Sequence, residues 1–110
     1  MAVTEIGRLC NEVIVRKIKE DKKVLNNRMA IKVGKDKTTF IDIEAWNGTA
    51  ELIGKHFKKG YEILVEGTLI NKTGKKNEEE FQTVALRVEQ IKFTNGNPKE
   101  SNEDVPDFLK

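Results

Sequence analysis

The sequence predicts an all-β protein, a small five-stranded barrel with one short helix between the third and fourth strands. Apolar residues alternate with polar ones along several segments, which is the pattern of half-buried strands. One segment alone, around residues 49–60, has the spacing of a helix. The chain has 110 residues, 37% of them hydrophobic, which suits one compact domain. A small split barrel and an unrelated α+β sheet are the structural alternatives.

The first three strands are expected before residue 47. Residues 3–18 predict one long strand with Gly7 as a bend or bulge, and residues 19–23 turn into the second strand. Residues 24–46 predict a hairpin, because two alternating segments flank a turn at 34–37. The side chains expected to face the interior of this hairpin are Met29, Ile31, Val33, Ile41, Ile43 and Ala45.

The helix should begin with Thr49 as its cap and stop before Gly60. Its apolar spacing rests on Leu52, Ile53, His56 and Phe57. Residues 61–69 and 81–93 predict the last two strands, joined by a loop over 71–80 with Gly74 at its tip. The inward set of the last strand changes from Val84, Leu86 and Val88 to Ile91 and Phe93, which predicts a bulge near Glu89 and Gln90. This element order is that of the oligonucleotide/oligosaccharide-binding (OB) fold.

The charge is unevenly distributed. The chain has 20 basic and 18 acidic residues, a net charge of +2. Residues 95–110 hold two basic and four acidic residues, so residues 1–94 carry 18 and 14, a net charge of +4. We therefore expect a folded basic domain over 1–94, a disordered acidic tail over 95–110, and a polyanionic partner for the domain.

Several classes of protein are not expected. The longest apolar runs have three residues, such as 13–15, and the N-terminus lacks a secretory pattern, so no membrane segment is predicted. Cys10 is the only cysteine, which predicts no intramolecular disulfide, no cysteine zinc site and a cytoplasmic location. His56 is the only histidine, and no triad, metal set or P-loop accompanies it. We expect neither an enzyme nor a cofactor.

Exposed aromatic side chains are the most informative feature. Phe40 and Trp46 lie six positions apart on one alternating strand, opposite its aliphatic residues, and Phe81 lies opposite Val84 on the last strand. Rings on a β-face are what base stacking requires. The alternative is that they pack at a subunit interface or under a loop. Asp42 and Glu44 share this outward face and would have to pair with Arg or Lys.

Residues 40–69 resemble the bacterial and phage single-stranded DNA-binding protein family. The resemblance rests on an aromatic at Phe40, the pattern W-x-x-x-A-E from Trp46, K-G at Lys59, and V-E-G-x-L from Val65. With Gly7-Arg8-Leu9 and the last strand it spans about residues 3–94. It implies an OB barrel, usually a homotetramer (a dimer is the alternative), that coats single strands with little sequence preference.

The resemblance also implies roles for individual residues. Phe40 and Trp46 match family positions that stack on bases. Arg16, Lys59 and Lys72 match positions that are often basic near the nucleic acid. Together with the basic residues of the outward strands and loops, the expected phosphate-binding set is Arg16, Arg28, Lys32, Lys35, Lys59, Lys72, Lys75 and Lys76.

The chain departs from the family pattern in ways that affect binding. Lys35 and Gly74 stand where further stacking aromatics are common, the loop over 34–38 is short, and Val13 replaces a common proline. Fewer rings imply a smaller footprint or weaker binding, and a stronger dependence on salt.

The end of the chain departs from the family as well. Family tails usually end in Pro-Phe and dock on partner proteins. Here the matching residues are Asp104, Val105, Pro106 and Phe108, but Asp107 intervenes and Leu109-Lys110 follow, so docking on replication and recombination proteins is in question.

Two competing functions follow from the sequence. The first is a single-stranded DNA-binding protein of replication, recombination and repair. The second is an adaptor of the primosome type, a barrel of the same family with weak nucleic-acid binding. Binding of RNA or tRNA on the same barrel stays open, because stacking does not read the sugar.

Overall fold

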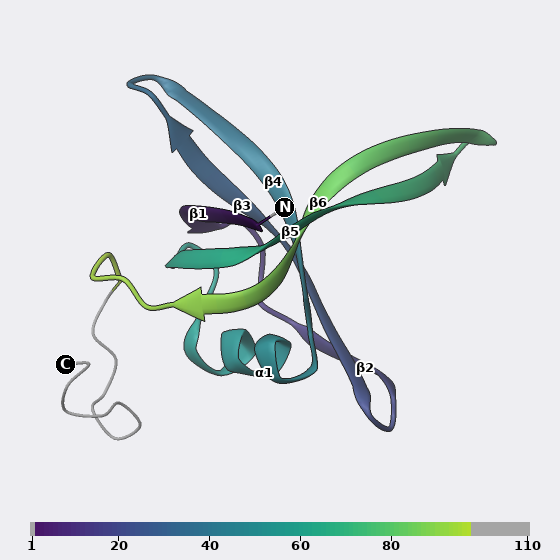
Figure 1. Cartoon of the computed structure of the whole chain (residues 1–110), viewed down its shortest axis with the longest axis horizontal. Helices are drawn as coiled ribbons and strands as arrows, with labels where there is room; N and C mark the ends of the chain where they lie inside the picture. The colour runs from purple at the N-terminus through teal and green to yellow at the C-terminus, as the bar shows by residue number, and fades with distance from the viewer. Residues whose placement is uncertain (1, 98–110) are drawn as a thin grey trace.

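The structure is a computed structural model that describes residues 2–97. Within these residues it has six strands and one helix (Figure 1). The elements are β1 (Ala2–Leu9), β2 (Val15–Lys19), β3 (Lys22–Val33), β4 (Lys37–Trp46), α1 (Asn47–His56), β5 (Glu62–Lys76) and β6 (Glu79–Lys92). The residues expected to form a docking tail, Asp104, Val105, Pro106 and Phe108, lie outside the described residues.

The strands form one sheet that closes on itself. Their order is β1-β5-β6-β4-β3-β2, and the end of β1 also pairs with β3. This extra pairing closes a ring of five strands, with β2 attached to β3 outside it. All pairs are antiparallel except β4 and β6, which run parallel over Asp42–Ala45 and 85–88. The predicted all-β class with one short helix is confirmed.

The hydrophobic core is formed by buried side chains of the five ring strands and of α1. Its largest fully buried side chains are Leu9, Leu25, Met29, Ile43, Ile53, Ile63, Val65 and Leu86. Most come from alternating positions of strands, as the sequence predicts, and burying each of them contributes about 1.5–3 kcal/mol. Phe57, just after the helix, is also buried and stacks on Phe93 with ring centroids 5.3 Å apart.

The prediction of one long strand over residues 3–18 is wrong. The segment forms two strands, β1 and β2, separated by residues 10–14. β1 pairs with β5 as far as Arg8 and with β3 from Arg8 onward. Gly7 precedes this change, and a Cβ on it would collide with Ala30 O and Met29 Cγ. Glycine is therefore required at residue 7 by the close approach of β3, and the regular register with β5 shows no bulge there.

The helix begins three residues earlier than predicted, comparing the expected cap with the observed one. Thr49 lies inside α1, Trp46 occupies the N-cap position, and no side chain caps the helix. Asn47, the first helical residue, accepts a hydrogen bond from the backbone N–H of Lys23 at 2.9 Å instead. The helix ends at His56, and Gly60, with φ +88°, belongs to the turn that leads into β5.

Two hairpins extend from the ring as arms that diverge in a V (Figure 1). The β3–β4 arm confirms the predicted hairpin over 24–46. The β5–β6 arm corrects a prediction, because residues 71–76 and 79–80 continue the strands and the turn lies at Asn77 and Glu78, not at Gly74. Val33 and Val84, expected inside, are 49% and 51% exposed, since a two-stranded arm has no core behind it.

The predicted bulge in the last strand is confirmed. Glu66 pairs with Gln90 while Gly67 pairs with Val88, so Glu89 has no partner on β5. Gly67 is essential to this arrangement, because a Cβ on it would overlap the backbone carbonyl of Arg87. After the bulge Ile91 packs against the core, as predicted, whereas Phe93, also expected inside, lies beyond the end of β6 and is 47% exposed.

Candidate nucleic-acid interface

A groove of about 530 Å³ lies where the bases of the two arms meet. It is lined by residues of β3 and β4, by Lys72 of β5, by Ala85 of β6 and by the chain just after β1. Its lining residues include one exposed ring, two cations and two carboxylates: Phe40, Arg28, Lys72, Asp42 and Glu44. The cross-strand register places Asp42 beside Arg28 on β3 and Ala85 on β6.

Phe40 supplies the aromatic surface of the groove. Its side chain is 58% exposed and lies opposite Ala30 on β3. Trp46 has the same orientation on β4 but lies at its far end, about 20 Å away at the rise of an extended strand. Trp46 is half-buried and does not line the groove. The two rings therefore share a face without forming one site.

Phe81 faces outward on the β5–β6 arm, as predicted, and is 46% exposed. It is paired with Gly74, and its ring covers that glycine so closely that a Cβ on Gly74 would overlap it. One face of the ring therefore packs on backbone. The structure thus presents a second exposed ring, on the other arm of the V.

The carboxylates of the outward face pair with cations, as the sequence required. Arg28 Nε lies 3.0 Å from Asp42 Oδ1, and both side chains are about half exposed. Lys72 Nζ donates to Glu44 Oε1 at 2.9 Å, although Lys72 lies 28 residues further along the chain. The expectation that Glu44 faces solvent is wrong, because Glu44 is only 5% exposed. It lies where β4 pairs with β6, beside Arg87 in the register.

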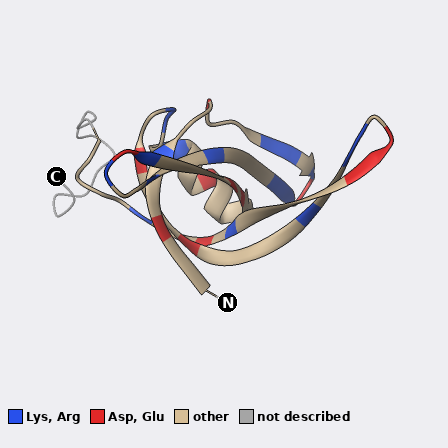
Figure 2. Ribbon diagram, turned by 90° about the horizontal axis from the view of Figure 1, so that it is seen from above, with Lys and Arg blue, Asp and Glu red and all other residues tan. Residues whose placement is uncertain are grey.

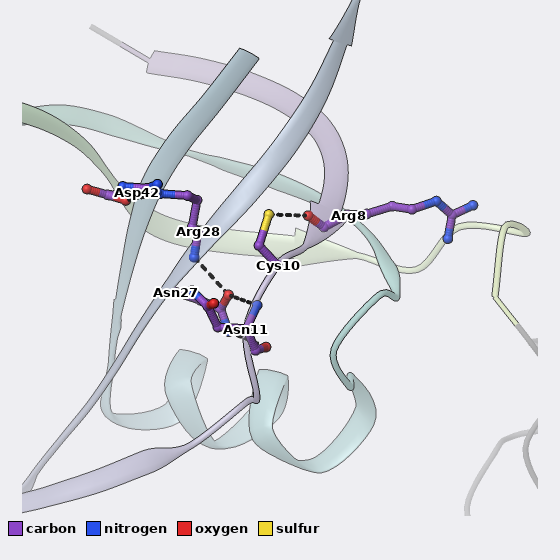
Figure 3. Close-up of polar contacts among 6 residues, drawn as sticks. All are labelled: Arg8, Cys10, Asn11, Asn27, Arg28 and Asp42. Atoms are coloured by element: carbon purple, nitrogen blue, oxygen red, sulfur yellow. Dashed lines mark hydrogen bonds and ion pairs between the residues drawn. The ribbon is translucent and has the colours of Figure 1, made fainter. Parts of the chain in front are cut away.

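Asn27 fixes the chain that borders the groove (Figure 3). Its buried side-chain oxygen accepts from the backbone N–H of Asn11 at 3.1 Å and of Arg28 at 2.7 Å. Its amide donates to the carbonyls of Asn11 and Glu12 at 3.1 and 3.3 Å. Cys10 N–H also donates to Arg28 O at 2.8 Å. The backbone of Arg28 is therefore held on both sides, beside Asp42.

The other predicted basic residues are dispersed. Arg16 of β2 pairs with Val24, which in turn pairs with Trp46, so Arg16 and Trp46 share a face two strands apart. Lys32 and Lys35 are exposed near the tip of the β3–β4 arm. Lys59 is exposed in the turn between α1 and β5, away from the groove lining.

The tip of the β5–β6 arm carries both signs of charge (Figure 2). Lys75 lies opposite Glu80, and Lys76 lies opposite Glu79. Cross-strand pairs of opposite charge attract each other, so these lysines are partly neutralised.

The sequence patterns did not predict three features of this region. Arg87, with Nε 3.7 Å from Glu44 Oε2, was not among the expected cations, although its parity on β6 matches that of Phe81. No local pattern predicts the structural role of Asn27, because three of its four hydrogen bonds go to residues 15 and 16 positions away. The burial of Glu44 depends on how β4 meets β6, which no local pattern reports.

His56 contacts Phe93 edge-on, with ring centroids 5.3 Å apart. Within residues 2–97, no group of three or more His, Cys, Asp or Glu side chains is arranged to hold a metal ion. No helix in that part of the chain is long and apolar enough to cross a membrane.

These features define a class of protein: a closed-ring β-protein with exposed rings and cations on two diverging arms. Residues 2–94 match the family model described as the Single-strand binding protein family, and the chain belongs to that family. It is similar to a protein of Aquifex aeolicus (strain VF5) named Single-stranded DNA-binding protein, with 32% identity over 77 residues. That alignment covers 64% of this chain and 52% of the relative, so the chain spans about half the length of the curated relative that it matches.

Proposed function

We propose that this chain binds single-stranded DNA with little sequence preference and that the groove between the arms is part of its path. The observation that carries the proposal is Phe40, a 58% exposed ring in a groove that also holds Arg28 and Lys72, in a member of this family. A large exposed ring among cations has a clear use in stacking on bases, at about 1–3 kcal/mol per base.

The mechanism combines stacking with neutralisation of phosphates. Phe40 and Phe81 offer rings on opposite arms, and Trp46 offers a third toward the far end of β4. Phosphates would be contacted by Arg16, Arg28, Lys32, Lys35, Lys59, Lys72, Lys75 and Lys76, and we add Arg87 to this set. Stacking accepts every base, and phosphate contacts carry no sequence information, so both terms favour general binding.

The test is a titration with unstructured oligothymidines of increasing length, at low and at moderate salt. Trp46 is the only tryptophan, so its fluorescence reports on that part of the surface alone, while the anisotropy of a labelled oligomer reports all binding. We expect short oligomers to bind without quenching Trp46, and longer ones to quench it and to saturate at a fixed nucleotide-to-protein ratio. Absence of an anisotropy change at both salt concentrations would overturn the proposal.

Two variants sharpen the titration. Phe40→Ala should weaken binding of every length, whereas Trp46→Ala should weaken only oligomers that quench Trp46 in the unaltered protein. Each variant should weaken binding to all base compositions alike, because a ring does not select a base. An effect confined to one sequence context would contradict general binding.

The finer parts of the proposal concern the cell. Single-strand binding suits replication, recombination and repair, and we propose a non-enzymatic role there, in the cytoplasm, for an OB-type domain that assembles as a homotetramer or a dimer. The closed ring of β1, β5, β6, β4 and β3 supports the OB assignment. Light scattering with and without oligothymidine would give the number of chains in the complex.

One observation favours a second function, that of a protein-interaction adaptor with weak nucleic-acid binding. Four of the proposed cations face carboxylates: Arg28, Lys72, Lys75 and Lys76. This lowers the positive potential available to DNA. Affinity weaker than micromolar at moderate salt would favour the adaptor, and matched DNA and RNA oligomers in the same assay would detect a preference for RNA.

A further inference from the structure

Glu44 is a buried charged residue, and burying a charge costs solvation free energy. It lies on β4 where that strand meets β6, beside Arg87 in the register, and is 5% exposed. Oε1 accepts from Lys72 Nζ at 2.9 Å. Oε2 is buried without a hydrogen-bond partner, and the nearest cation is Arg87 Nε at 3.7 Å. A single carboxylate therefore joins β4 to β5 and to β6.

The arrangement is asymmetric, because the anion is inside and the cations are outside. The Glu44 side chain is 6% exposed, whereas those of Lys72 and Arg87 are 42% and 52% exposed. Removing a cation from a buried carboxylate leaves that charge uncompensated, which strongly disfavours the separated state. Lys72, which lines the groove, and Arg87 are thus both held beside Glu44.

The same cations keep donors for another anion. Lysine has three N–H donors and arginine five, and the bond to Glu44 uses one N–H of Lys72. A phosphate oxygen can approach both cations from their solvent side without displacing Glu44. The two cations and the carboxylate together carry a net charge of +1.

We propose that Glu44 is a positioning residue, which holds Lys72 and Arg87 for one phosphate of the bound strand. This inference rests on the proposed binding of single-stranded DNA. It assigns to an acidic residue a favourable part in binding a polyanion, which is the reverse of what its charge alone predicts.

Glu44→Gln tests the inference, with Asp42→Asn as the matched control. Both residues lie on the same face of β4, two positions apart, and both line the groove. Asp42 is about half exposed and its pair with Arg28 is a surface pair. If charge alone mattered, both variants would bind oligothymidine more tightly. If Glu44 positions the two cations, Glu44→Gln should weaken binding of oligothymidine while Asp42→Asn strengthens it.

We expect Asp42→Asn to bind about twofold to threefold more tightly, as removal of an exposed charge allows. Glu44→Gln should bind about tenfold more weakly, the size of the coupling found within one polar network. Its salt dependence should also become shallower, by about 0.7 in the slope of log K against log salt concentration for each phosphate that is no longer neutralised. Anisotropy of a labelled oligothymidine at several salt concentrations measures both quantities.

A second substitution of Glu44, and the Glu44→Gln change made in a protein that lacks both cations, complete the test. Glu44→Asp keeps the charge but shortens the reach to Lys72, so it should weaken binding although electrostatics predicts no change. In a Lys72→Ala/Arg87→Ala background, Glu44→Gln should no longer weaken binding, because the groups it positions are absent. Urea unfolding of each variant checks that differences in affinity do not follow differences in stability.

The outcomes separate the inference from the function on which it rests. If the unaltered protein does not bind the oligomer, the proposed function fails and the inference fails with it. If the unaltered protein binds, and Glu44→Gln binds as tightly as Asp42→Asn with a steeper salt dependence, the inference alone is overturned.

Discussion

The ring of Phe81 lies over Gly74 on the neighbouring strand of the β5–β6 arm, so close that a side chain at residue 74 would displace the ring. The glycine backbone covers one face of the ring, and the side chain as a whole remains 46% exposed. A ring supported in this way loses little rotamer freedom when a base stacks on it. Gly74 thus supports the ring of Phe81 from a position at which the family pattern often has an aromatic residue.

We predict that Gly74→Val weakens oligothymidine binding as much as Phe81→Ala does, by about 1–3 kcal/mol. The first change displaces the ring of Phe81 from its support on the backbone, and the second removes the ring. The double variant should be no weaker than either single variant, because both act on one stacking site. Thr73→Val, one position away on the opposite face of β5, is the control and should bind normally. Full affinity of Gly74→Val in an anisotropy assay would contradict the prediction.

The position of a lysine on the arms should decide its effect on salt dependence. Lys75 and Lys76 face Glu80 and Glu79, so replacing both with alanine should change the slope of log K against log salt concentration by less than about 0.5. Lys32 and Lys35 are exposed on the other arm, and replacing both should lower the slope by about 1.4. Equal slopes for the two double variants would show that cross-strand carboxylates do not neutralise the lysines.

Gly67→Ala should strongly destabilise the protein. A Cβ there would overlap the carbonyl of Arg87, which is backbone and cannot move aside without disturbing the bulge at Glu89. Overpacking of this kind costs about 1–3 kcal/mol. Gly48→Ala, in the first turn of α1 with open space around it, is the control and should raise the free energy of unfolding by about 0.4–1 kcal/mol. Urea unfolding measures both, and a neutral Gly67→Ala would disprove the prediction.

Asn26 and Asn27 are adjacent, but we expect their replacement by alanine to change the free energy of unfolding by very different amounts. Asn27 is 5% exposed and makes four hydrogen bonds with backbone groups of residues 11, 12 and 28. Asn27→Ala leaves several of these groups unpaired and should lower the free energy of unfolding by about 2–4 kcal/mol. Asn26 is exposed, and Asn26→Ala should stay within about 0.5 kcal/mol of the unaltered protein. Similar unfolding midpoints for the two variants would refute this assignment.

Local patterns were sufficient for much of the fold. The alternation over residues 24–46 located a hairpin whose strands pair in that register, and the change of inward residues near Glu89 located the bulge. The side of the strand on which Phe40 and Phe81 lie followed from the same alternation, although their exposure did not, because Val33 and Val84 on the opposite face of the arms are about as exposed. Each of these depends on which side of a strand a residue occupies, and that side is set by position in the chain alone.

Other features depend on residues that are distant in the sequence. Residues 71–80 are polar and turn-like, yet most of them form strands, because backbone pairing and Lys–Glu pairs across the arm replace a core. The strand expected over 3–18 is interrupted at 10–14, where Asn27 supplies the hydrogen bonds that a neighbouring strand would supply.

The β class, the β3–β4 hairpin, the single helix and the outward side of the rings could be predicted from the sequence, because they follow from periodicity over a few residues. The position of the groove and the burial of Glu44 in it depend on tertiary structure. Glu44 becomes buried when β4 meets β6, and its charge is balanced by Lys72 and Arg87 from two other strands. Burial and pairing of a charge depend on which strands the closed ring brings together, and a pattern within one strand contains no information about its neighbours.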